Sequence, residues 1–165
     1  MSKSEENLKQ AFAGESQANR KYLAFAERAK RDGFPQAARL FLAAAEAETV
    51  HAHNHLRALK AIGDTAANLK EAVAGETHEF TAMYPEMLSA AKAEGAKDAE
   101  RSFRFALEVE KVHGKLYQDM LSNLGKTAEE FPYFVCPVCG YTAEKHAPGL
   151  CPICGTKGDM FKRIE

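Results

Sequence analysis

The stretch Glu48-Thr49-Val50-His51 decides the fold, together with a second copy at Glu110-Lys111-Val112-His113. On a helix, residues three apart lie on one face, one turn above the other. Each stretch therefore presents a carboxylate and an imidazole in the same direction. Together these two groups suit iron, manganese or zinc. One copy alone is weak evidence, because solvated Glu and His residues are common on helices. Two copies in matched surroundings would be much stronger evidence.

An internal repeat supplies those surroundings. The segment Ala13-Gly14-Glu15-Ser16 recurs 61 residues later as Ala74-Gly75-Glu76-Thr77. Asp32-Gly33 recurs 62 residues later as Glu94-Gly95, and the two Glu-x-x-His stretches are also 62 residues apart. Shared helix composition does not explain glycines, glutamates and histidines in phase. The pattern predicts a helical hairpin that occurs twice in the chain.

Glycines and prolines divide the Ala- and Glu-rich part of the chain into four predicted helices. The first covers roughly residues 4–31, the second runs from Pro35 to about Ile62 with Gly63 as its cap, and the third covers roughly 69–93. Gly95 marks the turn into a fourth helix that ends near Leu124-Gly125. Pro85 lies inside the third helix, where we expect a kink. Four such helices predict an all-α four-helix bundle.

Composition changes near Glu130, where prolines, glycines and all the cysteines begin to gather. This predicts a helical domain at 1–127 and a small loop-rich domain at 131–165. The formal net charge of −1 argues against nucleic acid as a partner. We expect no signal peptide, because the N-terminus has no apolar region, and no membrane span, because every apolar run is too short. These features predict a cytoplasmic protein.

The predicted connection between the two hairpins, at about residues 63–68, is short. Six extended residues reach about 20 Å, whereas a helix of about 25 residues is about 37 Å long. A ferritin-like bundle needs its second and third helices parallel, joined by a crossover along most of that length. We therefore hypothesise a domain swap, in which each bundle takes one hairpin from each of two subunits.

Counting outward from Gly33 and Gly95 puts seven candidate ligands at one level of the bundle, four to five turns from the hairpin ends. Five carboxylates buried there would repel one another and lose hydration, and two metal cations would offset both costs. Glu46 and Glu108 should instead face solvent. The seven candidates are Glu15, Glu48, His51, Glu76, Glu79, Glu110 and His113. A di-metal carboxylate bundle uses one Glu from each of two helices and a Glu-x-x-His from each of the others, so Glu79 is an extra.

Other polar side chains near this level are open to more than one interpretation. His55 is an alternative ligand or a solvated neighbour, whereas His53 and His78 should lie on the surface. Tyr22 and Tyr84 could pack as core residues or donate hydrogen bonds to ligand carboxylates.

Two matching knuckles, Cys136-Pro137-Val138-Cys139-Gly140 and Cys151-Pro152-Ile153-Cys154-Gly155, form the second motif. The helical part offers them no cysteine for a disulfide, so a tetrahedral metal site is favoured. Iron and zinc both suit four thiolates. The ligands of this site would be Cys136, Cys139, Cys151 and Cys154.

The chain resembles the rubrerythrins over its whole length, through Ala13-Gly14-Glu15-Ser16-Gln17-Ala18, Glu76-Thr77-His78-Glu79-Phe80 and Met83-Tyr84-Pro85. Its Cys-Pro-x-Cys-Gly-Tyr at 136–141 is similar to rubredoxin. The resemblance implies a ferritin-like di-iron bundle with a rubredoxin-like module that holds one iron (or zinc). It implies reduction of hydrogen peroxide to water in oxidative-stress defence, with electrons from a nicotinamide-dependent (NADH-linked) reductase or a rubredoxin, in a homodimer or higher homo-oligomer.

By resemblance, Glu48 and Glu110 would bridge the irons and Glu15 would bind one of them. Glu76 and His113 would bind the other. The first iron would exchange Glu79 for His51 when reduced, which accounts for the extra ligand. Tyr22 and Tyr84 match tyrosines near the metal site of the family, and the short linker resembles the domain-swapped members.

Three alternatives remain open from the sequence. A ferroxidase or iron store would need a hollow shell and leaves the cysteine module unexplained. A zinc-stabilised interaction protein would show no turnover, and an oxygen-activating di-iron oxygenase would need a substrate pocket, for which the sequence gives no signal.

Overall fold

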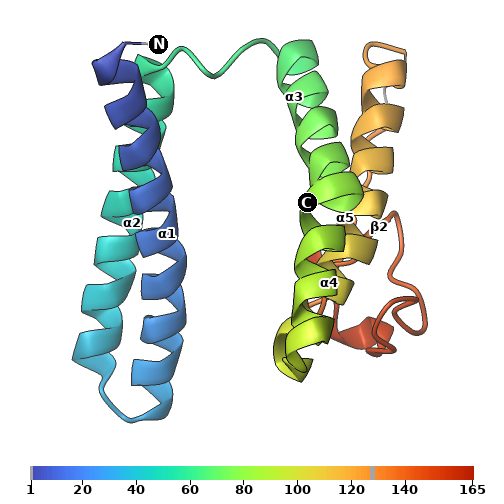
Figure 1. Ribbon diagram of the computed structural model, residues 1–165. Helices are drawn as coiled ribbons and strands as arrows, with labels where there is room; N and C mark the ends of the chain where they lie inside the picture. The colour runs from blue at the N-terminus through green and yellow to red at the C-terminus, as the bar shows by residue number, and fades with distance from the viewer. Residues whose placement is uncertain (1, 127–128) are drawn as a thin grey trace. The chain divides into compact units, whose positions relative to one another are not determined.

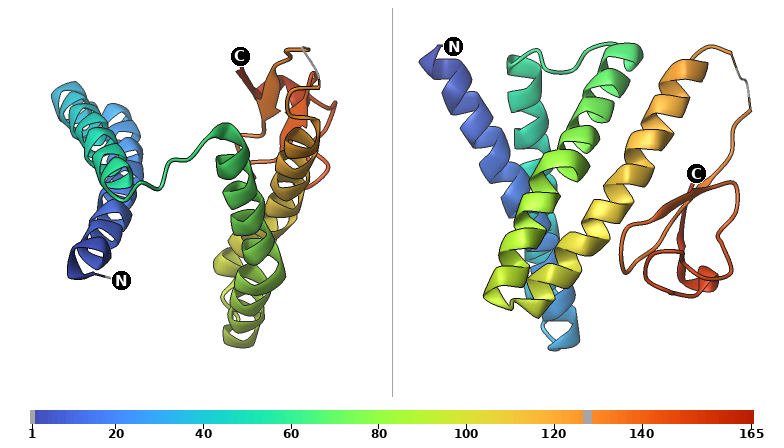
Figure 2. Two further views of the ribbon diagram at one scale, coloured as in Figure 1. Left: turned by 90° about the horizontal axis from the view of Figure 1, so that it is seen from above. Right: turned by 45° about the vertical axis from the view of Figure 1, so that its right-hand side comes forward.

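A computed structural model of the chain describes residues 2–126 and 129–165. It divides into two compact units, Met1–Gly63 and Asp64–Glu165, each with its own helical hairpin (Figures 1 and 2). Among the described residues, no helix combines the length and the apolar character that a membrane span requires. The predicted end of the helical domain, at residue 127, lies outside the described residues.

The first unit is the antiparallel pair α1 (Lys3–Arg31) and α2 (Pro35–Ala58), which lie side by side in Figure 1. A capping box starts α1: the Ser2 hydroxyl accepts from Glu5 N–H and the Glu5 carboxylate accepts from Ser2 N–H. Gly33, at a φ of 81°, makes the turn, and the next helix starts at the proline predicted for its first turn. Small side chains let the helices approach closely. The buried ones are Ala26, Ala29, Ala38, Ala45 and Ala52.

The end of α2 differs from the prediction. The helix stops at Ala58, so Gly63 is not its cap. Lys60 takes the left-handed conformation instead, at a φ of 53°, and Ala61 N–H donates to a carbonyl five residues back at 3.0 Å. The prediction failed because a lysine occupies a position that usually selects glycine or asparagine.

The second unit contains α3 (Thr65–His78), a π-helical turn η1 (Glu79–Met83), α4 (Tyr84–Glu94) and α5 (Lys97–Asn123). The side chain of Asp64 caps α3 by accepting from the N–H of Ala67 at 2.8 Å. The path from α3 to α4 packs along α5 as the second hairpin (Figure 1).

The predicted third helix therefore corresponds to α3, η1 and α4 together, a continuous helical segment with one irregular turn. The π-helical turn, Glu79–Met83, holds one more residue than an α-helical turn would. This extra residue explains why the repeat offset grows from 61 at Glu76 to 62 at Glu94. Pro85 lies in the first turn of α4, just after the π turn, where its missing N–H is tolerated. The irregularity thus precedes Pro85 and does not centre on it.

The cysteine module forms a small antiparallel sheet with strand order β2-β1-β3, built from β1 (Tyr133–Val135), β2 (Thr142–Glu144) and β3 (Lys162–Ile164). A short 3-10 turn, η2 (Gly158–Met160), precedes β3. The module's buried core is Cys136, Cys151 and Phe161. β2 contacts α5 within the second unit, and the right-hand view of Figure 2 shows the module beside that helix.

Candidate metal centres

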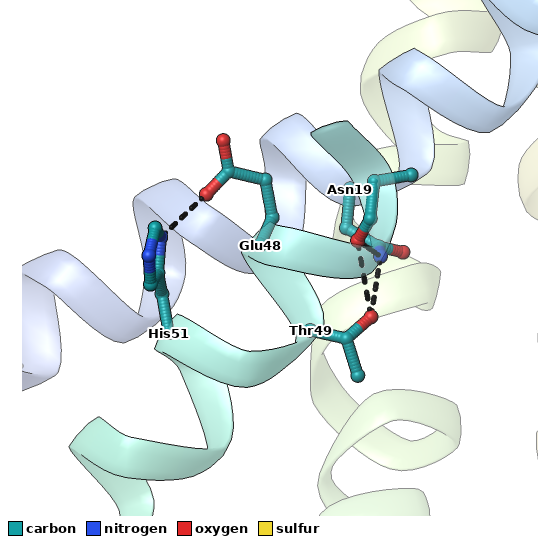
Figure 3. A network of polar contacts seen from close by, with 5 residues as sticks. Asn19, Glu48, Thr49 and His51 are labelled. Carbon is teal, nitrogen blue, oxygen red and sulfur yellow. Dashed lines mark hydrogen bonds and ion pairs between the residues drawn. The ribbon is translucent and has the colours of Figure 1, made fainter. Parts of the chain in front are cut away.

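The first hairpin brings three of the predicted ligands together. Glu15 on α1 and Glu48 and His51 on α2 offer ligand atoms that all lie within 4.8 Å of one another. His51 Nδ1 lies 3.0 Å from Glu48 Oε2, as Figure 3 shows, which is the one-turn contact expected from their spacing. The cluster lies at the surface of the unit, with the His51 side chain 53% exposed and the Glu48 side chain 17% exposed.

A polar clamp holds the register of the two helices beside this cluster. The Asn19 amide donates to the carbonyl of Ala45 at 2.7 Å and to the hydroxyl of Thr49 at 2.9 Å (Figure 3). Asn19 lies one turn beyond Glu15 on α1, and Thr49 follows Glu48 on α2. The clamp therefore fixes the level at which Glu15 meets Glu48.

The two carboxyl groups of the first cluster shift each other's pKa in opposite directions. A hydrogen bond to Glu48, together with burial, raises the pKa of Glu15 above its ordinary value. The same bond, with one from His51, lowers the pKa of Glu48. Two carboxyl groups this close cannot both ionise without a positive charge between them. A bound cation would supply that charge.

The second hairpin repeats the arrangement with Glu76 on α3 and Glu110 and His113 on α5. His113 Nδ1 lies 2.7 Å from Glu110 Oε2 and 3.9 Å from Glu76 Oε1. The exposed fractions of these side chains are lower here: 18% for Glu76, 17% for Glu110 and 27% for His113. Burial first, and then the charge of Glu110, raise the pKa of Glu76 to about 7.

Glu79 lies outside both compact clusters but close to the second. Burial, and then the charge of Glu110, raise the pKa of Glu79, and His113 opposes that shift. Burial, and then the charges of Glu79, Glu110 and Glu76, also raise the pKa of Tyr84. The Tyr84 hydroxyl therefore keeps its proton and can donate it in a hydrogen bond toward these carboxylates.

Tyr22 and Tyr84 occupy equivalent places in the two hairpins. The Tyr22 ring lies 6.2 Å from that of Phe41, and the Tyr84 ring lies 6.3 Å from that of Phe103, centroid to centroid. Both tyrosines therefore pack against phenylalanine rings. Tyr84 also lies close enough to the carboxylates for their charges to raise its pKa.

The remaining predicted positions follow the helix geometry. Glu46, Glu108, His53 and His78 are exposed, as the helix period predicts. His55 is half-buried, and its charge lowers the pKa of Glu15, so it lies near the first cluster without belonging to the compact set.

The four cysteines form the third cluster. Cys136 Sγ lies 3.5 Å from Cys154 Sγ, and Cys139 Sγ lies 3.5 Å from Cys151 Sγ. These separations exceed a disulfide bond and approach the edge, about 3.8 Å, of a tetrahedron with metal–sulfur bonds of about 2.3 Å. All four are free thiols.

The thiols have divergent acidities. Burial disfavours ionisation of Cys154, but hydrogen bonds from Thr156 outweigh it and lower the pKa of Cys154 to about 6. Burial raises the pKa of Cys139 well above its ordinary value. A cation bound among the four sulfurs would favour the ionised form of thiols such as Cys139, whose burial opposes ionisation.

The donor sets therefore fit the metals that the sequence predicts. Carboxylates and imidazoles in the hairpins suit iron, and the raised pKa values of Glu15 and Glu76 mark clustered negative charge that a cation would balance. Four thiolates at near-tetrahedral spacing suit iron or zinc.

Comparison with known proteins agrees with this chemistry. A family model described as rubrerythrin matches residues 6–121, and one described as the rubredoxin-like domain of rubrerythrin matches residues 134–162. The chain belongs to the rubrerythrin family. It is 39% identical to rubrerythrin-2 of Clostridium acetobutylicum, over 94% of this chain and 93% of that protein. It is 38% identical to rubrerythrin of Porphyromonas gingivalis, over 85% of this chain and 78% of that protein.

A solved structure of nigerythrin in its fully reduced, all-ferrous state is also similar, with 31% identity and a TM-score of 0.61 over 99% of this chain and 88% of that one. The predicted fold class and cofactors are thereby confirmed: a ferritin-like helical part with a di-iron site, and a rubredoxin-like module with a four-cysteine metal site. Rubrerythrins are generally non-haem di-iron proteins of oxidative-stress defence.

Three contacts near the clusters were not predicted from the sequence. They are the Asn19 clamp, the packing of Phe80 against Gly114, and a contact of Thr142 with His113. Asn19 could have been found, because it lies one turn after Glu15 on the same face. Thr142 carries no such signal, because its position depends on how the module packs on α5.

Proposed function

We propose that this chain is a peroxidase that reduces hydrogen peroxide to water at the di-iron site of its rubrerythrin fold. The observation that carries the proposal is the pair of matched clusters, each with two carboxylates and one imidazole within 4.8 Å. Two irons that pass between ferrous and ferric would supply the two electrons that peroxide reduction requires. The protein's own residues would hold those irons, deliver protons and bring electrons.

The proposed ligand roles follow from the helices on which the residues lie. Glu48 and Glu110 each contact the histidine one turn away and would bind iron beside it. By resemblance to the family, these two glutamates would be the ligands that the irons share. Glu15 would bind one iron. Glu76 and His113 would bind the other, supported by the 3.9 Å separation of Glu76 Oε1 and His113 Nδ1.

Glu79 and His51 would alternate as ligands of the first iron when it changes oxidation state. Glu79 begins the π-helical turn. Such turns are less regularly bonded than α-helix, which supports a side chain that shifts between two positions.

Tyr84 and Tyr22 would donate hydrogen bonds near the reacting oxygen atoms. The raised pKa of Tyr84 supports this role, because the hydroxyl remains a donor beside the carboxylates. Two protons are consumed for each peroxide reduced to two waters.

Electrons would reach the bundle through a thiolate-bound iron at the four cysteines. The donor would be a nicotinamide-dependent reductase (NADH-linked) or a rubredoxin. The module's contact with α5, the helix that carries Glu110 and His113, supports such a path.

The active bundle would contain hairpins from two subunits, a homodimer or a higher oligomer. The caps at Lys60–Ala61 and at Asp64 occupy most of the linker and leave only Ile62 and Gly63 between them. Even six extended residues reach about 20 Å, whereas α2, at 24 residues, is about 36 Å long. A crossover between parallel helices within one chain would need about the full helix length.

The test is anaerobic reoxidation by peroxide of protein whose irons have all been reduced. The proposal expects the bundle irons and the thiolate-bound iron to return to the ferric state together, with one peroxide consumed for every two irons oxidised. Reoxidation no faster than that of a Glu48→Ala/Glu110→Ala variant would refute it.

A further inference from the structure

The side chain of Thr142 joins the cysteine module to the second metal cluster. Thr142 opens β2, and its Oγ1 lies 3.0 Å from Nε2 of His113 on α5. The other ring nitrogen, Nδ1, faces the carboxylates of Glu110 and Glu76. The His113 ring thus stands between the carboxylates on one edge and the module on the other.

The hydroxyl proton of Thr142 has its own acceptor. Thr142 Oγ1 donates to the carbonyl of Gly140 at 3.2 Å. A hydroxyl has a single proton, so once it is given to Gly140, the oxygen can only accept from His113. That requires a proton on Nε2. With a proton on Nε2, Nδ1 can present its lone pair to a metal that takes the place of its 2.7 Å contact with Glu110 Oε2.

The backbone that carries Thr142 is itself fixed against α5. A Cβ added to Gly140 would lie 3.7 Å from Cγ1 of Val109, which is 2% exposed. Gly140 N–H also donates to the carbonyl of Cys136 at 3.0 Å. The position of the hydroxyl is therefore set by the fold of the cysteine knuckle.

We propose that Thr142 is a positioning residue for His113: it selects the Nε2–H tautomer and so makes metal binding at the second cluster depend on the module. Removing such a partner of a metal-binding histidine typically lowers metal affinity by about 10- to 100-fold. His51, with the same Nδ1 contact to a glutamate but 53% of its side chain exposed, serves as an internal comparison. The inference depends on His113 binding a metal and is independent of peroxide turnover.

The test uses Zn²⁺ as a diamagnetic probe in the full chain. In the Zn²⁺-loaded wild type, NMR should show a slowly exchanging Nε2 proton on His113 and a faster one on His51. Thr142→Val, which replaces the hydroxyl by a methyl of similar size, should remove the protection at His113 only. Chelator competition, after the four-cysteine site is filled, should show at least about tenfold weaker Zn²⁺ binding in the helices.

Thr142→Ser keeps the hydroxyl and should behave like the wild type in both measurements. Ser122→Ala is the control: it removes an exposed hydroxyl on α5 that donates to the carbonyl of Gln118 at 2.8 Å, and should leave His113 unchanged. If Thr142→Val loses its four-cysteine site, Thr142→Ala takes its place. Helix-site affinity within twofold of the wild type, with the His113 proton still protected in a hydroxyl-free variant, would overturn the proposal.

Discussion

Phe80 packs directly over Gly114: a Cβ added to Gly114 would lie only 3.2 Å from Phe80 Cε1 and 3.6 Å from Glu76 Cβ. This contact sets the separation of the π-helical turn and α5 beside the second cluster. We expect Gly114→Val to lower the free energy of unfolding by about 1–3 kcal/mol, because the added methyl groups overpack the contact. Chemical denaturation of the metal-free protein measures this loss.

A double-mutant cycle identifies the cause. In a Phe80→Ala background the ring is absent, so Gly114→Val should cost much less than it does in the wild type. An equal cost in both backgrounds would mean that Phe80 is not the group that limits the space at Gly114.

Replacing Glu79 by Ala should separate metal binding from turnover. Each cluster keeps its two carboxylates and its imidazole, so two irons per bundle should still bind. Peroxide turnover should fall by at least about tenfold if Glu79 alternates with His51 as a ligand. Iron content and steady-state rates are the measurements, with Glu46→Ala, at an exposed position of α2, as the control. Wild-type rates in the Glu79 variant would rule out the alternation.

The raised pKa of Glu76 makes the stability of the metal-free protein depend on pH. Burial first, then the charge and hydrogen bond of Glu110 and the charge of Glu79, disfavour the ionised form, so the folded pKa of Glu76 is about 7 against an ordinary value of 4.5. The folded state thus binds more protons in this window, and the stability contributed by Glu76 falls as pH rises from 4.5 to about 7.

Glu76→Gln removes that charge and should raise the melting temperature of the metal-free protein at about pH 8, with little effect at about pH 4. A Glu46→Gln control should show no such difference. A gain that is the same at both pH values would show that the ionisation of Glu76 is not the cause.

The proposed exchange of hairpins between subunits predicts complementation. One variant carries Glu48→Ala and His51→Ala in its first hairpin, and the other carries Glu110→Ala and His113→Ala in its second. Each alone should lack a complete metal site. In a swapped heterodimer, one bundle would combine the two intact hairpins and the other the two defective ones. Co-expression should therefore restore peroxide turnover, whereas unswapped bundles would remain inactive in any mixture.

The candidate ligands could be predicted because, on a helix, the sequence spacing of two residues determines whether their side chains lie on the same face. Glu48 with His51, and Glu110 with His113, stand one turn apart, and the structure brings each pair within 3.0 Å. The step in the repeat offset between Glu76 and Glu94 was also visible in the sequence. Its cause, the π-helical turn, was not, because the sequence alone predicted a single helix with a kink at Pro85.

Other features depend on packing that no local pattern encodes. Lys60 ends α2 in a left-handed conformation that favours glycine, so the sequence pointed to Gly63 instead. Asn19 and Phe80 occupy equivalent positions of the repeat, yet one clamps its hairpin by hydrogen bonds and the other packs over a glycine. Thr142 meets His113 only because the module folds against α5.

We propose that the clusters of the two hairpins together form one site for a pair of irons. Mössbauer and EPR spectroscopy of the fully oxidised protein test it most directly, because ferric irons bridged by a carboxylate couple their spins. We expect the two irons of the helical part to be a coupled, EPR-silent pair, and the single iron at the four cysteines to be uncoupled and ferric. Uncoupled ferric signals from the helical part, with one iron in each hairpin, would contradict it.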